Sequence, residues 1–310
     1  TLAGHGNEFH LLRDYPNRWS AWDIEASAME DFEIVASDGR GTVEECGPLR
    51  VVLAFDRPFG NSHIRQRLIL RAGSARVDFD TEVDWRERDR VLKVSFPLSV
   101  HADHSVAEIQ FGHVRRPTHR NTSWDAARFE VPIHRWIDLC EADFGVALLN
   151  NGIFGCDVLG NRVRLTLLKS ASAPDPVADI GIHRRTFSLY PHAGTTLGGR
   201  VIEEAISLNS PLLVRIGAPG GPEETSWLSV DQPAVTLEAF KRSEDGKRLV
   251  MRWLEAGGRD VEASFSSSLP GLTFCDADLL ENAVDSDSAS TVQKLRPFDI
   301  RTYRSLRKPI

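Results

Sequence analysis

Apolar and polar residues alternate with a period of two along much of the chain, which is typical of β-strands with one buried face. Residues 77–84 read Val-Asp-Phe-Asp-Thr-Glu-Val-Asp, and apolar residues alternate in the same way within 92–96 and 162–167. Further strands are expected at 49–55, 63–71, 105–113, 127–133, 144–149, 184–191, 234–241, 249–255, 260–266 and 299–304, with Gly, Pro, Asn and Asp between them. A β-α-β alternation is missing, so the pattern predicts an all-β protein of packed antiparallel sheets.

One segment is expected to be helical, because its apolar residues repeat with a helical period. These residues are Leu197, Val201, Ala205 and Leu208. The helix should end before Pro211, because proline cannot continue a helix. Thr195 or Thr196, in a glycine-rich lead-in, is a candidate for the cap at its start.

Glycine and proline gather in residues 217–233, which we interpret as a linker between two domains. A large β domain is expected at 1–216 and a small β domain at 234–310. The acidic, serine-rich stretch 281–290 is expected to form a loop of the small domain.

Composition narrows the functional class. The 310 residues carry a formal net charge of −7, which argues against a nucleic-acid-binding surface. Hydrophobic residues make up 41%, enough for sizeable cores, and no apolar run approaches the ~20 residues of a membrane span.

The chain starts at Thr1 without a signal peptide, so we expect a piece of a longer, cytoplasmic polypeptide. Its four well-separated cysteines are expected to be free, buried thiols in a reducing compartment.

The densest polar cluster is expected to form a long loop at residues 113–125. It brings together arginine, histidine, tryptophan and aspartate. Charged groups of this kind hydrogen-bond sugar hydroxyls, and an indole packs on the apolar face of a pyranose. Contact with a carbohydrate and packing against another domain of the same polypeptide are both open interpretations.

A second polar stretch, residues 174–183, holds potential metal ligands at Asp175, Asp179 and His183. A loop held by Asx turns is favoured over a metal site there, and a surface turn is favoured at residues 101–104. The sequence contains no nucleophile elbow, zinc-protease pair, phosphate-binding loop or dinucleotide fingerprint.

The run from Arg116 to Trp136, Arg-Pro-Thr-His-Arg-Asn-Thr-Ser-Trp-Asp-Ala-Ala-Arg-Phe-Glu-Val-Pro-Ile-His-Arg-Trp, resembles the C-terminal half of glycoside hydrolase family 38 α-mannosidases, closest to the bacterial and cytosolic branch. Segments in matching order include Trp-Ser-Ala-Trp-Asp-Ile at 19–24, Gly-Val-Ala-Leu-Leu-Asn at 145–150, Leu-Tyr-Pro-His at 189–192 and Pro-Phe-Asp-Ile at 297–300. Ser20 stands where the family has Asp, and Cys156 where it usually has Tyr.

This resemblance implies a galactose-mutarotase-like supersandwich followed by a small immunoglobulin-like β-sandwich. Members of the family are retaining, zinc-dependent exo-α-mannosidases whose zinc ligands and nucleophile lie in an N-terminal catalytic domain. By resemblance, this chain holds no catalytic residue and no metal, and zinc belongs to that other domain. The implied partners are the catalytic domain of the same polypeptide and a mannose-containing glycan, with no nucleic acid and no membrane; a homo-oligomer stays open.

Loops of this half close one side of the catalytic cleft in the family. Arg116, His119, Asp125 and His183 are therefore our candidates for contact with the substrate or the catalytic domain. Two alternatives are a stand-alone carbohydrate-binding module, with Trp124 and Trp136 as its aromatic platform, and a structural or oligomerisation domain. A mutarotase-type isomerase would share the fold, but it would need a histidine and a glutamate converging in one concave face.

Overall fold

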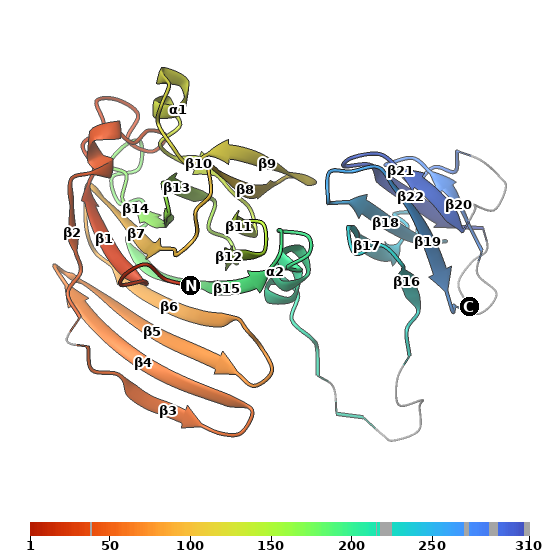
Figure 1. Cartoon of the computed structure of the whole chain (residues 1–310), viewed down its shortest axis with the longest axis horizontal. Helices are drawn as coiled ribbons and strands as arrows, with labels where there is room; N and C mark the ends of the chain where they lie inside the picture. The colour runs from red at the N-terminus through yellow and green to blue at the C-terminus, as the bar shows by residue number, and fades with distance from the viewer. Residues whose placement is uncertain (38, 215, 218–224, 270–272, 285–290, 307–310) are drawn as a thin grey trace. The chain divides into compact units, whose positions relative to one another are not determined.

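The computed structural model (Figure 1) describes residues 1–37, 39–214, 216–217, 225–269, 273–284 and 291–306. The chain divides into two compact units, Thr1–Ile109 with Val114–Pro211, and Gln110–His113 with Leu212–Ile310. Of the expected linker, residues 218–224 lie outside the described residues, and the remainder contains a short strand, β16 (Leu228–Val230). Of the expected loop at 281–290, residues 285–290 lie outside them.

The larger unit contains two antiparallel sheets. Over the described residues, the smaller sheet has six strands, in the order β10 (Val131–Pro132), β13 (Gly155–Leu159), β14 (Arg162–Lys169), β7 (Arg90–Pro97), β1 (Glu8–Arg13) and β2 (Phe32–Ile34). The larger has nine, in the order β3 (Thr42–Cys46), β4 (Arg50–Phe59), β5 (Ser62–Arg71), β6 (Val77–Trp85), β15 (Gly181–Ala193), β12 (Phe144–Asn150), β11 (Trp136–Cys140), β8 (His104–Ile109) and β9 (Gly112–Pro117). A 3₁₀ turn, η1, covers Ala26–Met29.

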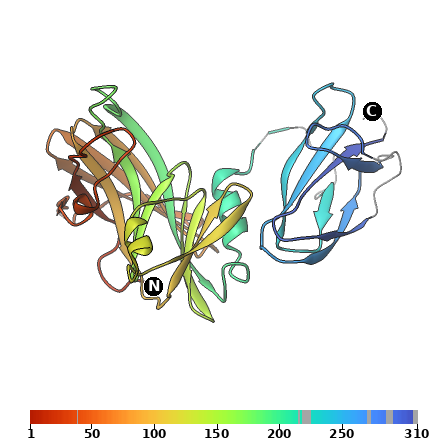
Figure 2. The same ribbon diagram turned by 90° about the horizontal axis from the view of Figure 1, so that it is seen from above.

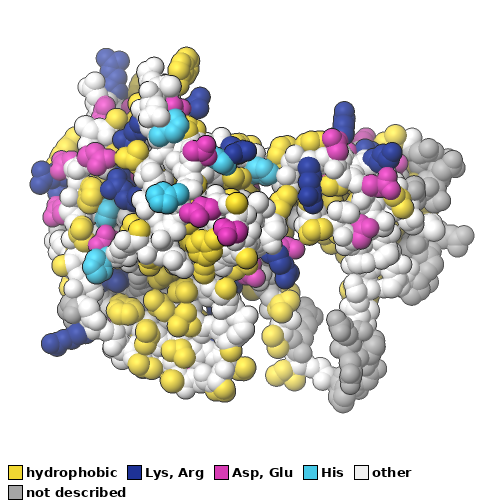
Figure 3. Space-filling view, viewed as in Figure 1, with side chains coloured by type: hydrophobic (Ala, Val, Ile, Leu, Met, Phe, Trp, Pro, Cys, Tyr) yellow, Lys and Arg dark blue, Asp and Glu magenta, His cyan; other side chains and the backbone are white. Residues whose placement is uncertain are grey.

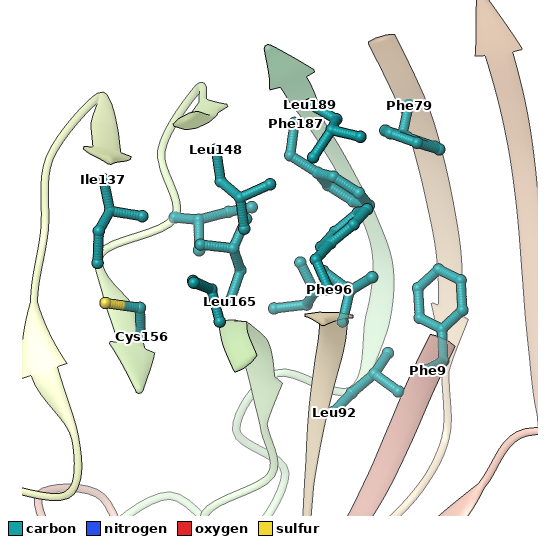
Figure 4. Close-up of a cluster of buried hydrophobic side chains, with 14 of the residues drawn as sticks. Phe9, Phe79, Leu92, Phe96, Ile137, Leu148, Cys156, Leu165, Phe187 and Leu189 are labelled. Atoms are coloured by element: carbon teal, nitrogen blue, oxygen red, sulfur yellow. The ribbon is translucent and has the colours of Figure 1, made fainter. Parts of the chain in front are cut away.

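The inner faces of these two sheets form the main core (Figure 4). Phe79 of β6 and Phe187 of β15 stack with ring centroids 5.3 Å apart, and Phe96 of β7 lies 5.7 Å from Phe79. The aromatic rings thus join the sheets across the sandwich, and alternation along each strand supplies the residues that meet there.

The six-stranded sheet leaves one end of the larger sheet uncovered. Val43, Leu53, Leu68 and Phe79 face each other across β3, β4, β5 and β6 and therefore share one face. Phe79 is 4% exposed, whereas Val43 at the far end of this row is 59% exposed. Hydrophobic side chains gather over this part of the molecule in Figure 3. The outer strands therefore present a partly solvated apolar face, of the kind that marks an interaction surface.

The C-terminal unit is a smaller β-sandwich. Among its described residues, one sheet contains β16, β19 (Val261–Ser267) and β21 (Val292–Leu295). The other contains β17 (Val235–Arg242), β18 (Leu249–Glu255), β22 (Ile300–Ser305) and β20 (Phe274–Ala277). Phe265 lies between Trp253 and Tyr303, with centroid distances of 5.1 and 6.0 Å. The prediction of an all-β protein with a large and a small sandwich is confirmed.

Two local predictions were wrong. The strand expected at 105–113 is two strands, β8 and β9, with β9 continuing to Pro117 into the expected loop. The strand expected at 127–133 is reduced to β10, and its first residue, Ala127, belongs to a short helix, α1 (Ser123–Ala127). The Thr122 cap and two alanines favour that helix.

The expected helix forms as α2 (Val201–Asn209), which packs against β11 and β12 (Figures 1 and 2). Its N-cap is Arg200 in the left-handed conformation, so the prediction of a threonine cap was wrong. Thr196 instead donates its hydroxyl to Oδ2 of Asp138, 2.7 Å away on β11. No helix in the described ranges is long and apolar enough to cross a membrane.

The cysteines are free, as expected, but their burial differs. Cys156 and Cys275 are buried and Cys140 is half-buried, whereas Cys46 is exposed on the edge strand β3. Burial raises the pKa of the Cys156 thiol, and that side chain belongs to the core (Figure 4). The cysteine that replaces the family's tyrosine is therefore a packing residue in this chain.

Candidate functional site

The polar run from Arg116 onward leaves β9, turns, and enters α1. Thr118 fixes the turn, because its hydroxyl donates to the carbonyl of Ala102 at 2.7 Å and its own carbonyl accepts from the amide of Gly160 at 2.6 Å. Thr122 caps α1 by accepting from the amide of Asp125 at 3.1 Å. Local capping and two flanking anchors therefore hold this polar segment in a defined shape.

Three of the four candidate residues line one pocket. Arg116, His119 and Asp125 surround it together with Ser105, Pro117, Arg120, Arg128, Val131 and Val158. Nδ1 of His119 lies 3.7 Å from Oδ2 of Asp125 and accepts a hydrogen bond from the amide of Asn121.

The pocket is strongly cationic in a chain of net negative charge. Three arginines line it against a single aspartate. Burial lowers the pKa of Arg116, and the positive charge of Arg128 lowers it further. Arg120 approaches Glu30 at 4.0 Å, whereas neither Arg116 nor Arg128 forms an ion pair within the described residues.

The strands beside the pocket carry a buried charge cluster of a different kind. Nζ of Lys93 lies 2.9 Å from Oδ2 of Asp157 and also contacts Glu130. Nε of Arg164 lies 2.9 Å from Oδ1 of the same aspartate. Lys93, Arg164 and Asp157 are almost completely buried, and Asp157 and Glu130 together balance the two cations. The cluster links neighbouring strands of the six-stranded sheet, and loss of one partner would leave a buried charge uncompensated.

The fourth candidate, His183, is not part of this pocket. It lies at the start of β15, where its half-buried imidazole contacts the carbonyl oxygen of Asp179 at 2.7 Å through Nε2. Oδ1 of Asp175 accepts from the amide of Val177 at 3.0 Å, which is the expected Asx turn. Within the described residues, no three His, Cys, Asp or Glu side chains are grouped to hold a metal ion.

Ser20 connects this second loop to the N-terminal segment. Its hydroxyl accepts from the amides of Ser172 and Ala173, at 3.0 and 2.9 Å, and donates to the carbonyl of Ala173. The serine that stands where the family has aspartate thus supplies a comparable hydrogen-bond acceptor for the backbone.

The two tryptophans considered as a sugar platform have opposite environments. Trp124 on α1 is 75% exposed, whereas Trp136 on β11 is 1% exposed and belongs to the interior. Trp136 is therefore excluded from such a platform.

Trp19 and Trp22, like Trp124, are exposed, and their rings lie edge to face with centroids 6.1 Å apart. These two were not singled out, although their spacing in Trp-Ser-Ala-Trp was visible.

Sequence reasoning also missed Arg120 and Arg128 as pocket residues. Both stand in the run that carried the family resemblance, but their proximity to Arg116 depends on the turn and on α1. An arginine three residues after Asp125 is one helical turn away, which is the signal that could have placed Arg128 near it.

Comparison with known proteins decides the family. Residues 1–177 match the glycosyl hydrolases family 38 C-terminal domain, and residues 234–303 match the family 38 C-terminal beta sandwich domain. The chain belongs to glycoside hydrolase family 38. It corresponds to the C-terminal domains of that family, as the resemblance in the sequence indicated.

Relatives within family 38 are considerably longer. Alpha-mannosidase 2C1 of Mus musculus is 44% identical over 96% of this chain and 30% of its own length. Alpha-mannosidase G of Dictyostelium discoideum is 38% identical over 96% of this chain and 29% of its own length. The structure of an alpha-mannosidase from Enterococcus faecalis V583 shares the fold, with a TM-score of 0.81 at 16% identity over 96% of this chain and 38% of that one.

Proposed function

We propose that this chain is the C-terminal β half of a retaining, zinc-dependent α-mannosidase that removes terminal α-mannosyl residues from glycans. The observation that carries the proposal is the match to both C-terminal family 38 domains, in order, along one chain. The 44% identity to an alpha-mannosidase over nearly the whole chain supports it further.

The zinc and the nucleophile belong, in this proposal, to an N-terminal catalytic domain of the same polypeptide. The described residues do not offer a donor set for zinc, since His183 is bound to the backbone carbonyl of Asp179 and Asp175 to the amide of Val177. We assign no chemical step to this chain. Its free cysteines fit a reducing compartment, so we propose a cytoplasmic location.

The chain would contribute binding and orientation. The imidazole of His119 and the carboxylate of Asp125 are groups that hydrogen-bond sugar hydroxyls, and the exposed indole of Trp124 lies on the adjacent helix. Holding parts of the substrate that do not react positions the scissile bond and lowers the entropic part of the barrier.

The uncovered apolar face of β3–β5 fits the same proposal. The relatives extend far beyond the matched region, so another part of the longer polypeptide is available to pack on this face. We propose that a preceding segment covers the row from Leu68 to Val43.

Hydrolysis of an aryl α-mannoside, with metal analysis of the same sample, tests the function. The chain of 310 residues should show no turnover and no stoichiometric zinc, and the longer polypeptide should show both. Removing residues 1–310 from the longer polypeptide should abolish turnover. A truncated protein that is still fully active would contradict the proposal, and so would metal-dependent turnover by this chain by itself.

Exposed aromatic residues favour a second candidate, an independent carbohydrate-binding module. Trp19, Trp22 and Trp124 all present accessible indole rings. Titration of the isolated chain with mannose oligosaccharides, followed by tryptophan fluorescence, separates the two candidates. Saturable binding without the rest of the polypeptide would favour the module.

A further inference from the structure

Arg116 and Arg128 are the two guanidinium groups of the pocket that the fold leaves without a counter-charge. Neither side chain forms an ion pair or hydrogen bond with any residue the structure describes. Nη1 of Arg116 is fully buried and has no hydrogen-bond partner among those residues. The lining of the pocket therefore carries two guanidinium groups that no carboxylate of the described residues pairs with.

Comparable cations close to the pocket have carboxylate partners, although Nη2 of Arg164, like Nη1 of Arg116, is buried without a hydrogen-bond partner among the described residues. Arg164 and Lys93 share the carboxylate of Asp157. Arg135, which directly precedes β11, donates Nε to both carboxylate oxygens of Glu108 at 3.0 Å. An unneutralised charge that is partly withdrawn from water lowers stability, so such groups normally have partners. Arg116 is half-buried and has no carboxylate partner among the described residues, so it departs from this pattern, and the exposed Arg128 beside it adds a second unpaired positive charge.

The size of the pocket decides the class of ligand. Its cavity volume is about 20 Å³. A cavity needs roughly 10–15 Å³ to hold one water molecule, so this pocket admits a small group such as a carboxylate or a single sugar hydroxyl, but not a whole pyranose ring. Arginine forks bind planar carboxylates through paired, charge-assisted hydrogen bonds.

We propose that the pocket lined by Arg116 and Arg128 binds a carboxylate group. This inference goes beyond the proposed function, because mannose is neutral and offers no counter-charge to these arginines. Two sources supply the same chemistry: an acidic side chain elsewhere in the longer polypeptide, or a small carboxylic acid that is free or linked to the sugar.

Titration of the 310-residue chain with sodium acetate, against sodium chloride at equal ionic strength, tests the site. We expect acetate to raise Tm saturably, because a ligand that binds only the folded state stabilises it. Amide NMR shifts of residues 116–128 should saturate in parallel. Arg116→Gln and Arg128→Gln should each weaken binding by ~10-fold or more, the effect of losing a charged hydrogen bond.

Arg115→Gln is the matched control. Arg115 is an exposed neighbour on β9 whose Nη2 contacts Nδ1 of His104 at 3.0 Å, so its loss should change acetate binding by less than about two-fold. Arg128 is exposed, and Arg128→Gln therefore keeps the fold and carries the test even if Arg116→Gln does not fold. A response equal to that of chloride, or equal in all four proteins, overturns the proposal.

The same titration in the longer polypeptide identifies the source. If a side chain of the polypeptide fills the pocket, acetate should have no effect there although it binds the shorter chain. If the ligand is a separate acid, the saturable response should persist. The two proposals can fail independently. If the longer polypeptide has no mannosidase activity, the proposed function is contradicted, but the acetate response of this chain should be unchanged.

Discussion

Nε2 of His192 lies 3.0 Å from Oδ1 of Asp138, and both side chains are buried between the nine-stranded sheet and the segment that leads into α2. Thr196 donates to the other oxygen of this aspartate. The pair therefore fixes the start of the helical segment on β11 and β15. Burial by itself lowers the pKa of His192, but the hydrogen bond and charge of Asp138 outweigh it, so the pKa is raised above 6.5.

This shift predicts a stability that depends on pH. A histidine whose folded pKa is raised stabilises the fold fully below pH 6.5 and loses that contribution as pH rises through the folded pKa. The free energy of unfolding of the wild type should therefore exceed that of His192→Gln more at pH 5.5 than at pH 9. Urea unfolding at both values measures this. A difference that grows with pH would contradict the assigned pair.

His10 should respond in the opposite direction. Burial, followed by the charges of Arg164 and Arg162, lowers its pKa to about 4, and its ring stacks on Phe32 with centroids 4.2 Å apart. The unfolded chain binds a proton below pH 6.5 and the folded chain does not, so stability is lost as pH falls from 6.5 toward 4.

The measurement for His10 is acid unfolding of His10→Phe, which keeps the stack on Phe32. The variant should lose less stability than the wild type between pH 6.5 and 4, by up to about 3 kcal/mol. Equal acid sensitivity of the two proteins would show that His10 does not carry the effect.

Asp157→Asn should strongly destabilise the larger unit. Lys93 and Arg164 would be left buried with their shared carboxylate gone, a loss expected to cost about 3–5 kcal/mol. Asp84→Asn is the control, because its pair with Arg86 is exposed and should contribute less than about 1 kcal/mol. Thermal and urea unfolding compare the two. Similar losses would mean that burial of the cluster does not determine its contribution.

Much of this fold could be predicted because its strands alternate strongly. Residues 77–84 fall within β6, and the observed strand extends the pattern by one residue to Trp85. Which strands pair could not be predicted, because β6 lies beside β15, about a hundred residues away along the chain. Long-range pairing depends on packing of whole faces and leaves no local signal.

The same distinction between local and long-range signals applies to the candidate site. Arg116, His119 and Asp125 are close in sequence and meet in one pocket, so a local polar cluster was informative. His183 belongs to a different polar stretch, was proposed as a contact residue by resemblance, and lies outside that pocket. The charge imbalance could not be predicted, because it depends on which arginines find a carboxylate. Arg164 does so through β13, whereas Arg116 does not.

Trp124→Ala should affect substrate binding and not folding. The indole is exposed on α1, so its removal should change the free energy of unfolding by less than about 0.5 kcal/mol. In the longer polypeptide, a lost sugar-stacking surface should raise KM for a mannose oligosaccharide by ~5–10-fold, the effect of about 1 kcal/mol of aromatic contact. KM for a small aryl mannoside should hardly change, because that substrate does not extend to the loop.

Trp227→Ala is the matched control, since Trp227 is an exposed tryptophan of the C-terminal unit. Equal rises in KM for both substrates, or for both variants, would show that Trp124 does not contact the glycan.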